Sequence, residues 1–162
     1  MRILVTEVTE MHKGNYCVAG WSFENGTMVR PMPNGAHWTA ALLSSHNVTP
    51  GAYIEFNALG QPQSAYPHRT EDTLIDASTI KQNGFFAAPW LGSVAPPTAA
   101  TLHEAFEDNV RNNSSWNGFL QGVYVPFGAQ TRSLFAVSTP GQNLRFFQDQ
   151  RNKLRAYLVD RI

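Results

Sequence analysis

Short runs of strand-forming residues, separated by turn signals, dominate the first sixty residues of the chain. The runs read RILVTEVT (2–9), YCVAGWSF (16–23), TMVRPMP (27–33) and AYIEFNAL (52–59). β-Branched and aromatic residues favour strands. Asn25 and Gly26 between two runs are typical of a tight hairpin, because both tolerate positive φ. This pattern predicts a mainly β fold built of small barrels and argues against a helical bundle or a parallel α/β sheet.

The second half repeats the pattern after a proline-rich interruption. Four further runs are predicted to be strands, at 118–127, 133–138, 144–148 and 153–160. One clear helix is predicted around residues 98–112, where Leu102 and Phe106 are spaced for one helical face. A shorter helix is expected within 34–45. The stretch GFFAAPWLGSVAPPT is the best internal boundary. We therefore divide the chain into a unit at 1–82, a Pro/Gly-rich connector at 83–97 and a unit at 98–162.

Charge is divided unequally along a chain whose formal net charge is zero. Residues 1–110 hold five basic and ten acidic residues, whereas residues 111–162 hold seven basic and two acidic ones. This division predicts either different partners for the two halves or an attraction between them. Cys17 is the only cysteine, which excludes an intrachain disulfide and favours a small buried side chain. The sequence shows neither a signal-peptide pattern nor an apolar run of membrane-spanning length. We therefore expect a cytoplasmic protein without membrane contact.

The densest polar stretch is YPHRTEDTLID, at residues 66–76. His68 and Glu71 would share a face in a helical turn, and Asp72 follows directly. Three interpretations stay open. Thr70 could cap a helical turn with Glu71 and Asp72 at its start. The residues could form a ligand-binding cluster, or they could serve a metal or acid–base chemistry.

Arg30 marks a second candidate site, in VRPMPNGAHW. Pro31 cannot donate a ladder hydrogen bond, so the strand ends or lies at an edge there, and Arg30 faces the loops. Trp38 could stack on a base or fill the core. Arg30 could instead pair with Glu55 or Glu71.

The last two predicted strands, LRFFQ and KLRAYLVD, offer a third candidate site. Arg155 and Tyr157 lie on one face of the second strand, a mixture typical of surfaces that bind single-stranded nucleic acid. An even loop would put Phe146 beside Arg155, whereas an odd loop would put Arg145 and Phe147 there. The alternative is an ordinary solvated sheet face.

The motifs ILVTEVTEMHKGNYCVAGW, VRPMP, PHRTED and LRAYLVD together resemble the dual OB-fold (DuOB) domain of prokaryotic conflict and defence systems. The resemblance implies two OB-like units, the second compact for a complete barrel. It implies binding of nucleic acid or a nucleotide and no established catalytic reaction. It also implies a loop order that brings His68 and Glu71 near Arg30, with an Arg30–Glu71 or Arg30–Asp72 pair.

We therefore expect a non-catalytic module that binds or senses nucleic acid or a nucleotide in a bacterial defence system, beside an effector protein. No cofactor and no metal are expected. The expected ligand-binding residues are Arg30, His68, Glu71, Asp72, Arg145, Arg155 and Tyr157. One alternative is a protein-interaction subunit that docks a partner through its acidic half. Another is a small hydrolase that uses His68 with Glu71 or Asp72. No phosphate-binding GxxxxGK loop, GxSxG elbow or HExxH helix occurs in the chain.

Overall fold

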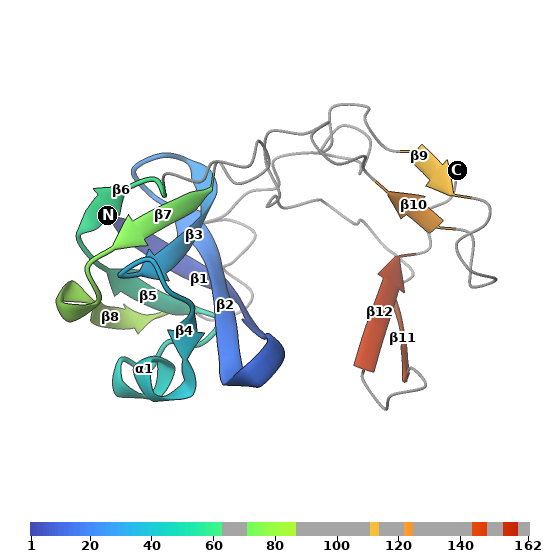
Figure 1. The fold of residues 1–162 in the computed structure, drawn as a ribbon, viewed down its shortest axis with the longest axis horizontal. Helices are drawn as coiled ribbons and strands as arrows, with labels where there is room; N and C mark the ends of the chain where they lie inside the picture. The colour runs from blue at the N-terminus through green and yellow to red at the C-terminus, as the bar shows by residue number, and fades with distance from the viewer. Residues whose placement is uncertain (63–70, 87–110, 114–121, 125–143, 149–153, 159–162) are drawn as a thin grey trace.

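The computed structural model describes residues 1–62, 71–86, 111–113, 122–124, 144–148 and 154–158 (Figure 1). These residues are mainly in strands, as the sequence predicted. The N-terminal part contains eight strands: β1 (Arg2–Glu10), β2 (Asn15–Ser22), β3 (Thr27–Pro33), β4 (Trp38–Thr39), β5 (Ala52–Glu55), β6 (Ala58–Gly60), β7 (Asp72–Ile75) and β8 (Lys81–Phe85). It also contains helix α1 (Ala40–Ser45) and two 3-10 turns, η1 (His12–Gly14) and η2 (Ala77–Thr79).

Eight strands form one curled sheet in the order β6-β7-β3-β2-β1-β5-β8, with β4 paired to β2. β1, β2 and β3 form an antiparallel meander, and β5 returns to lie beside β1, which is a Greek-key arrangement. β7 pairs with β3 in parallel. The strands therefore do not simply follow one another across the sheet.

The short link between β5 and β6 connects the two outer strands of the series β1-β2-β3-β7, because it bonds to the chain at both of them. The Phe56 amide donates to the Met1 carbonyl at 3.0 Å, on the β1 side. The Asp76 amide donates to the Asn57 carbonyl at 3.0 Å, on the β7 side. With β5 and β6 taken as one bent strand, five strands curl into a barrel-like unit, with α1 between the third and fourth strands. This is the architecture of a small Greek-key barrel of the OB type.

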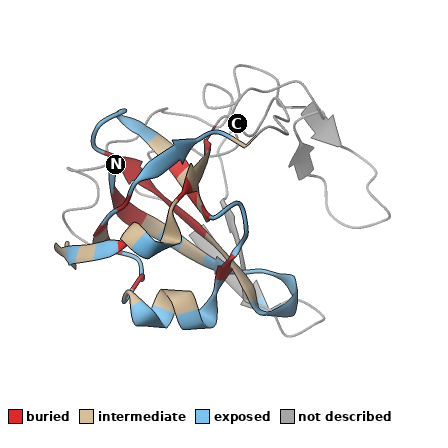
Figure 2. Ribbon diagram, turned by 60° about the vertical axis from the view of Figure 1, so that its left-hand side comes forward, coloured by how far each residue is buried: buried red, intermediate tan, exposed pale blue. Residues whose placement is uncertain are grey.

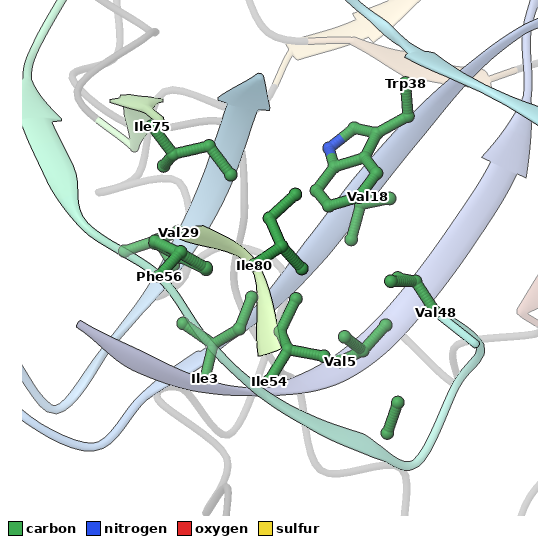
Figure 3. Packing of buried hydrophobic residues seen from close by; sticks show 11 residues of the cluster. Ile3, Val5, Val18, Val29, Trp38, Val48, Ile54, Phe56, Ile75 and Ile80 are labelled. Carbon is green, nitrogen blue, oxygen red and sulfur yellow. The ribbon is translucent and has the colours of Figure 1, made fainter. Parts of the chain in front are cut away.

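The core lies inside the curled sheet (Figures 2 and 3). Its buried aliphatic and aromatic residues come from β1 to β5, from β7 and from three links between elements: Ile3, Val5, Val18, Val29, Trp38, Val48, Ala52, Ile54, Phe56, Ile75 and Ile80. β1 and β2 approach closely at Gly20, where a Cβ atom would lie 2.5 Å from the Leu4 carbonyl oxygen. Only glycine allows this contact without a backbone shift.

The predicted strand over 52–59 is in fact two strands, β5 and β6, with Phe56 and Asn57 between them. The bend lets the first half pair with β1 and the second half with β7. The helix expected within 34–45 is limited to α1, whose start is capped by Thr39. The Thr39 hydroxyl accepts a hydrogen bond from the Leu42 amide at 3.2 Å.

The predicted helix around residues 98–112 is wrong at its C-terminal end. Residues 98–110 lie outside the described part of the chain, but at 111 and 112 the backbone belongs to strand β9 (Arg111–Asn113). β9 pairs antiparallel with β10 (Gly122–Tyr124), and this pairing is incompatible with a helix there. Among the described residues, α1 is the only segment that forms an α-helix.

The remaining predictions concern the strands of the second half and the connector at 83–97. The predicted strands at 118–127, 144–148 and 153–160 contain β10, β11 (Leu144–Gln148) and β12 (Leu154–Leu158). The predicted strand at 133–138 lies outside the described residues. β8 extends past residue 82, so the N-terminal sheet reaches into the range assigned to the connector. None of the helices described in the structure is long and apolar enough to cross a membrane.

Candidate functional site

Arg30 and Asp72 form an ion pair across β3 and β7. The parallel register places them directly opposite each other. Arg30 Nη1 donates to Asp72 Oδ1 at 2.9 Å, although the residues are 42 positions apart in the sequence. The Asp72 side chain is 3% exposed and the Arg30 side chain 24%. The expected Arg30–Asp72 pair is therefore confirmed, and the arginine is oriented by a buried carboxylate.

Glu71 lies next to Asp72 in sequence but lines a different space. Glu71 and Thr73 line a cavity of about 350 Å³, whereas neither Arg30 nor Asp72 does. Successive residues of an extended chain point to opposite faces, which separates Glu71 from Asp72. The two carboxylates therefore do not form one cluster. Glu71 contributes its backbone to the Arg30 region, since its carbonyl accepts from the Arg30 amide at 2.8 Å.

The interpretation of YPHRTEDTLID as a capped helical turn is wrong where the structure describes it. Asp72 begins strand β7 instead of lying in the first turn of a helix. The helical piece comes later, at η2, where the Asp76 side chain caps the turn by accepting from the Ser78 amide at 2.9 Å. His68 and Thr70 lie outside the described residues, so the role of His68 stays a prediction.

Cys17 lies near Arg30 on the outer face of the barrel. Burial raises the pKa of the Cys17 thiol, and the neighbouring Arg30 guanidinium opposes that shift. The residue is half-buried. Arg30 follows the core residue Val29 in β3, so the two residues lie on opposite faces of the strand.

Trp38 belongs to the core and cannot stack on a ligand. Its side chain is buried, and its indole nitrogen donates to the Pro31 carbonyl at 2.7 Å. The core interpretation of Trp38 is therefore confirmed. The same hydrogen bond anchors the second half of β3, the strand that carries Arg30.

The backbone of β11 and β12 decides between the two registers that the sequence left open. Arg145 pairs with Tyr157, and Phe147 pairs with Arg155. Residues directly opposite each other in an antiparallel pair share a face. The register therefore pairs each of these arginines with an aromatic residue, as an odd loop predicts. Figure 1 shows the two strands side by side.

Sequence reasoning missed the cavity beside Glu71. Its described lining comes from Met1, from the turn before β3 and the start of β3, from β6 with the residue after it, and from the start of β7 with the residue before it. These segments lie far apart in the sequence. No local motif connects these segments, so only the closure of the barrel could reveal them.

Within the described ranges, no group of three His, Cys, Asp or Glu side chains is arranged to hold a metal ion. Comparisons with protein-family models, with curated proteins and with solved structures gave no match. The site is therefore interpreted from its own geometry.

Proposed function

We propose that this chain is a non-catalytic module that binds nucleic acid or a nucleotide, of the kind that the DuOB resemblance implies for bacterial defence systems. The observation that carries the proposal is the register of β11 and β12, with Arg145 opposite Tyr157 and Phe147 opposite Arg155. In this register, arginine and aromatic positions alternate both along each strand and across the pair.

This alternation suits a single strand better than a duplex. Arginines neutralise phosphates, while aromatic rings stack on unpaired bases without selecting their sequence. The surplus of basic residues in 111–162 supports the same assignment. The OB-like barrel supports it independently, because barrels of this type bind oligonucleotides on the outer face of their second and third strands. Arg30, held by Asp72 on that face, is the proposed phosphate contact of the N-terminal unit.

The test is the salt dependence of binding to a labelled single-stranded oligonucleotide, measured by fluorescence anisotropy. Affinity should fall with salt, with a log–log slope of about −0.7 for each neutralised phosphate. Arg155→Glu should lose most of the affinity. Lys81→Glu makes the same charge change at an exposed position of β8 and should bind nearly as well as the wild type.

Two results would contradict the proposal. One is the absence of binding to any DNA, RNA or nucleotide at low salt, which would favour a protein-interaction subunit with an acidic docking surface. The other is an equal loss of affinity in the Arg155 and Lys81 variants, which would mean that only net charge matters.

A further inference from the structure

Three aromatic rings meet on the outer surface of the N-terminal barrel, those of Phe23, Tyr53 and Phe86, which we call the ring cluster. Tyr53 lies in β5 between the core residues Ala52 and Ile54, so its side chain points away from the core. The rings of Phe23 and Phe86 stand at 88° and 85° to the Tyr53 ring, with centre-to-centre distances of 5.4 Å and 5.9 Å. Edge-to-face contacts of this kind stabilise the arrangement of the three rings.

The ring cluster can be reached from solvent. Phe23 is 37% exposed, and Tyr53 and Phe86 are half-buried. In the register of β5 and β8, Tyr53 lies opposite Gly84, which has no side chain. A Cβ atom added to Gly84 would meet no atom within 4 Å. The position beside Tyr53 on β8 is therefore open space.

The charged residues beside the ring cluster come in opposite pairs. Arg2 Nε donates to Glu24 Oε1 at 2.8 Å, and Lys81 lies opposite Glu55 in the register of β5 and β8. Opposite charges so close together leave little field to attract a phosphate from a distance. The ring cluster therefore offers ring surface without a surplus of charge, and binding to it should depend little on salt.

We infer that the ring cluster stacks on the bases of a single-stranded nucleic acid, with the exposed ring of Phe23 as the main contact; this deepens the function proposed above and rests on it. Every base has a π-face, so aromatic rings stack on all of them without selecting a sequence. The contacts with Tyr53 and Phe86 position the Phe23 ring before a base arrives, which reduces the entropy lost on binding. The barrel then supplies a base contact, while the arginines supply the phosphate contacts.

The packing of the rings disfavours a proline-rich peptide as the ligand. Such peptides bind in grooves lined by aromatic side chains. In the ring cluster the three ring centres lie within 6.5 Å of one another, so the rings touch and no groove separates them. A flat base that stacks on one exposed ring needs no groove.

The experiment measures binding of the full chain to a labelled single-stranded oligothymidylate by fluorescence anisotropy at several salt concentrations. Phe23→Leu keeps an apolar side chain but removes the exposed ring. Because the loss of one base stack weakens binding about tenfold, this variant should lose about that factor at every salt concentration. The log–log slope against salt should stay that of the wild type, because no phosphate contact is lost.

An abasic oligomer of the same length and charge shows whether the ring acts on bases. The wild type and Phe23→Leu should bind this oligomer with equal affinity. Phe23→Trp restores an aromatic ring and should bind oligothymidylate at least as tightly as the wild type. Recovery in this variant would show that the loss in Phe23→Leu comes from the missing ring.

Phe85 provides the matched control. It is 60% exposed and lies opposite the core residue Ala52, so it belongs to the other face of β8. Phe85→Leu makes the same chemical change outside the ring cluster and should bind oligothymidylate like the wild type.

The outcomes separate this inference from the function on which it rests. If Arg155→Glu loses affinity while Phe23→Leu binds like the wild type, the proposed function stands and the ring cluster is not a base contact. An equal loss in Phe23→Leu and Phe85→Leu, or a loss that persists with the abasic oligomer, would also overturn the inference. If no nucleic acid binds at low salt, both proposals fail, and the exposed rings would fit a protein partner instead.

Discussion

At the scale of single residues, burial separates ion pairs that look alike. The Arg30–Asp72 and Arg2–Glu24 pairs have nearly equal nitrogen–oxygen distances, 2.9 Å and 2.8 Å. Asp72, however, has a side chain that is 3% exposed, whereas Arg2 and Glu24 have side chains that are 51% and 38% exposed. Water and salt screen the exposed pair, so its contribution to stability is small. In the Arg30–Asp72 pair, by contrast, the Asp72 carboxylate is almost completely removed from water.

We predict that Arg30→Gln lowers the free energy of unfolding by about 3 kcal/mol, because it leaves the Asp72 carboxylate buried without its cation. The matched variant Arg2→Gln removes an ion pair of similar length at the surface and should leave stability almost unchanged. Urea unfolding followed by circular dichroism measures both. Equal losses in the two variants would show that burial does not distinguish these pairs.

At the scale of elements, the joint between β7 and β8 is made by a capped turn. Asp76 follows β7 directly, and its carboxylate accepts from the Ser78 amide at 2.9 Å and from the Ser78 hydroxyl at 2.6 Å. These hydrogen bonds, first the one from the hydroxyl, lower the pKa of Asp76 from its ordinary value of 3.8. The folded state thus favours the ionised carboxylate, and the turn that directs the chain from β7 into β8 depends on it.

We predict that Asp76→Ala destabilises the protein near neutral pH and that the difference from the wild type shrinks in acid. Because the folded-state pKa is the lower one, the stabilisation is complete above 3.8 and is lost as pH falls through the lowered pKa. Asp76→Asn keeps an acceptor oxygen for the cap but has no charge to titrate. Its stability difference from Asp76→Ala should therefore not vary with pH between about 3 and 7. Urea midpoints at several pH values measure these differences; a wild-type advantage that grows in acid would contradict the assignment.

At the scale of the whole molecule, the core cluster of the described residues lies in the N-terminal barrel. The residues of its core cluster lie between Ile3 and Ile80. The last described residue of this part, Phe86, donates from its amide to the Gly51 carbonyl at 2.8 Å, and its ring packs edge-on against that of Tyr53. β8 is thereby attached to β5 over its full length. The barrel needs the chain as far as Phe86.

We predict that a fragment of residues 1–86 folds alone and unfolds cooperatively in urea, since a core of this size is near the lower limit for an independent domain. A fragment of residues 1–82 cuts β8 in its middle and should be markedly less stable. A fragment of residues 1–76 removes Ile80 from the core and should not fold. If 1–86 were unfolded while the full chain is folded, the barrel would require the second half of the sequence.

Much of the secondary structure could be predicted from the sequence because it depends on local chemistry. The alternation of β-branched and aromatic residues predicted β1, β2, β3 and β11 nearly to the residue. The Asn25-Gly26 turn predicted the hairpin between β2 and β3. The interpretation of 71–75 was wrong, however, because the local signal for a capped turn is weaker than a place in the sheet. β7 lies between β3 and β6 and gains hydrogen bonds on both edges, which override the local preference.

The sequence by itself determined most of the strands, because propensity and alternation act between near neighbours. It did not predict β7 or β9. Apart from the hairpin between β2 and β3, the tertiary structure decided which strands pair. It placed Arg30 opposite Asp72, selected the register of β11 and β12, and assigned Glu71 to the cavity and Asp72 to the ion pair. The physical reason is that a strand with unpaired edges can pair with any other, and the choice depends on closing one barrel around one core.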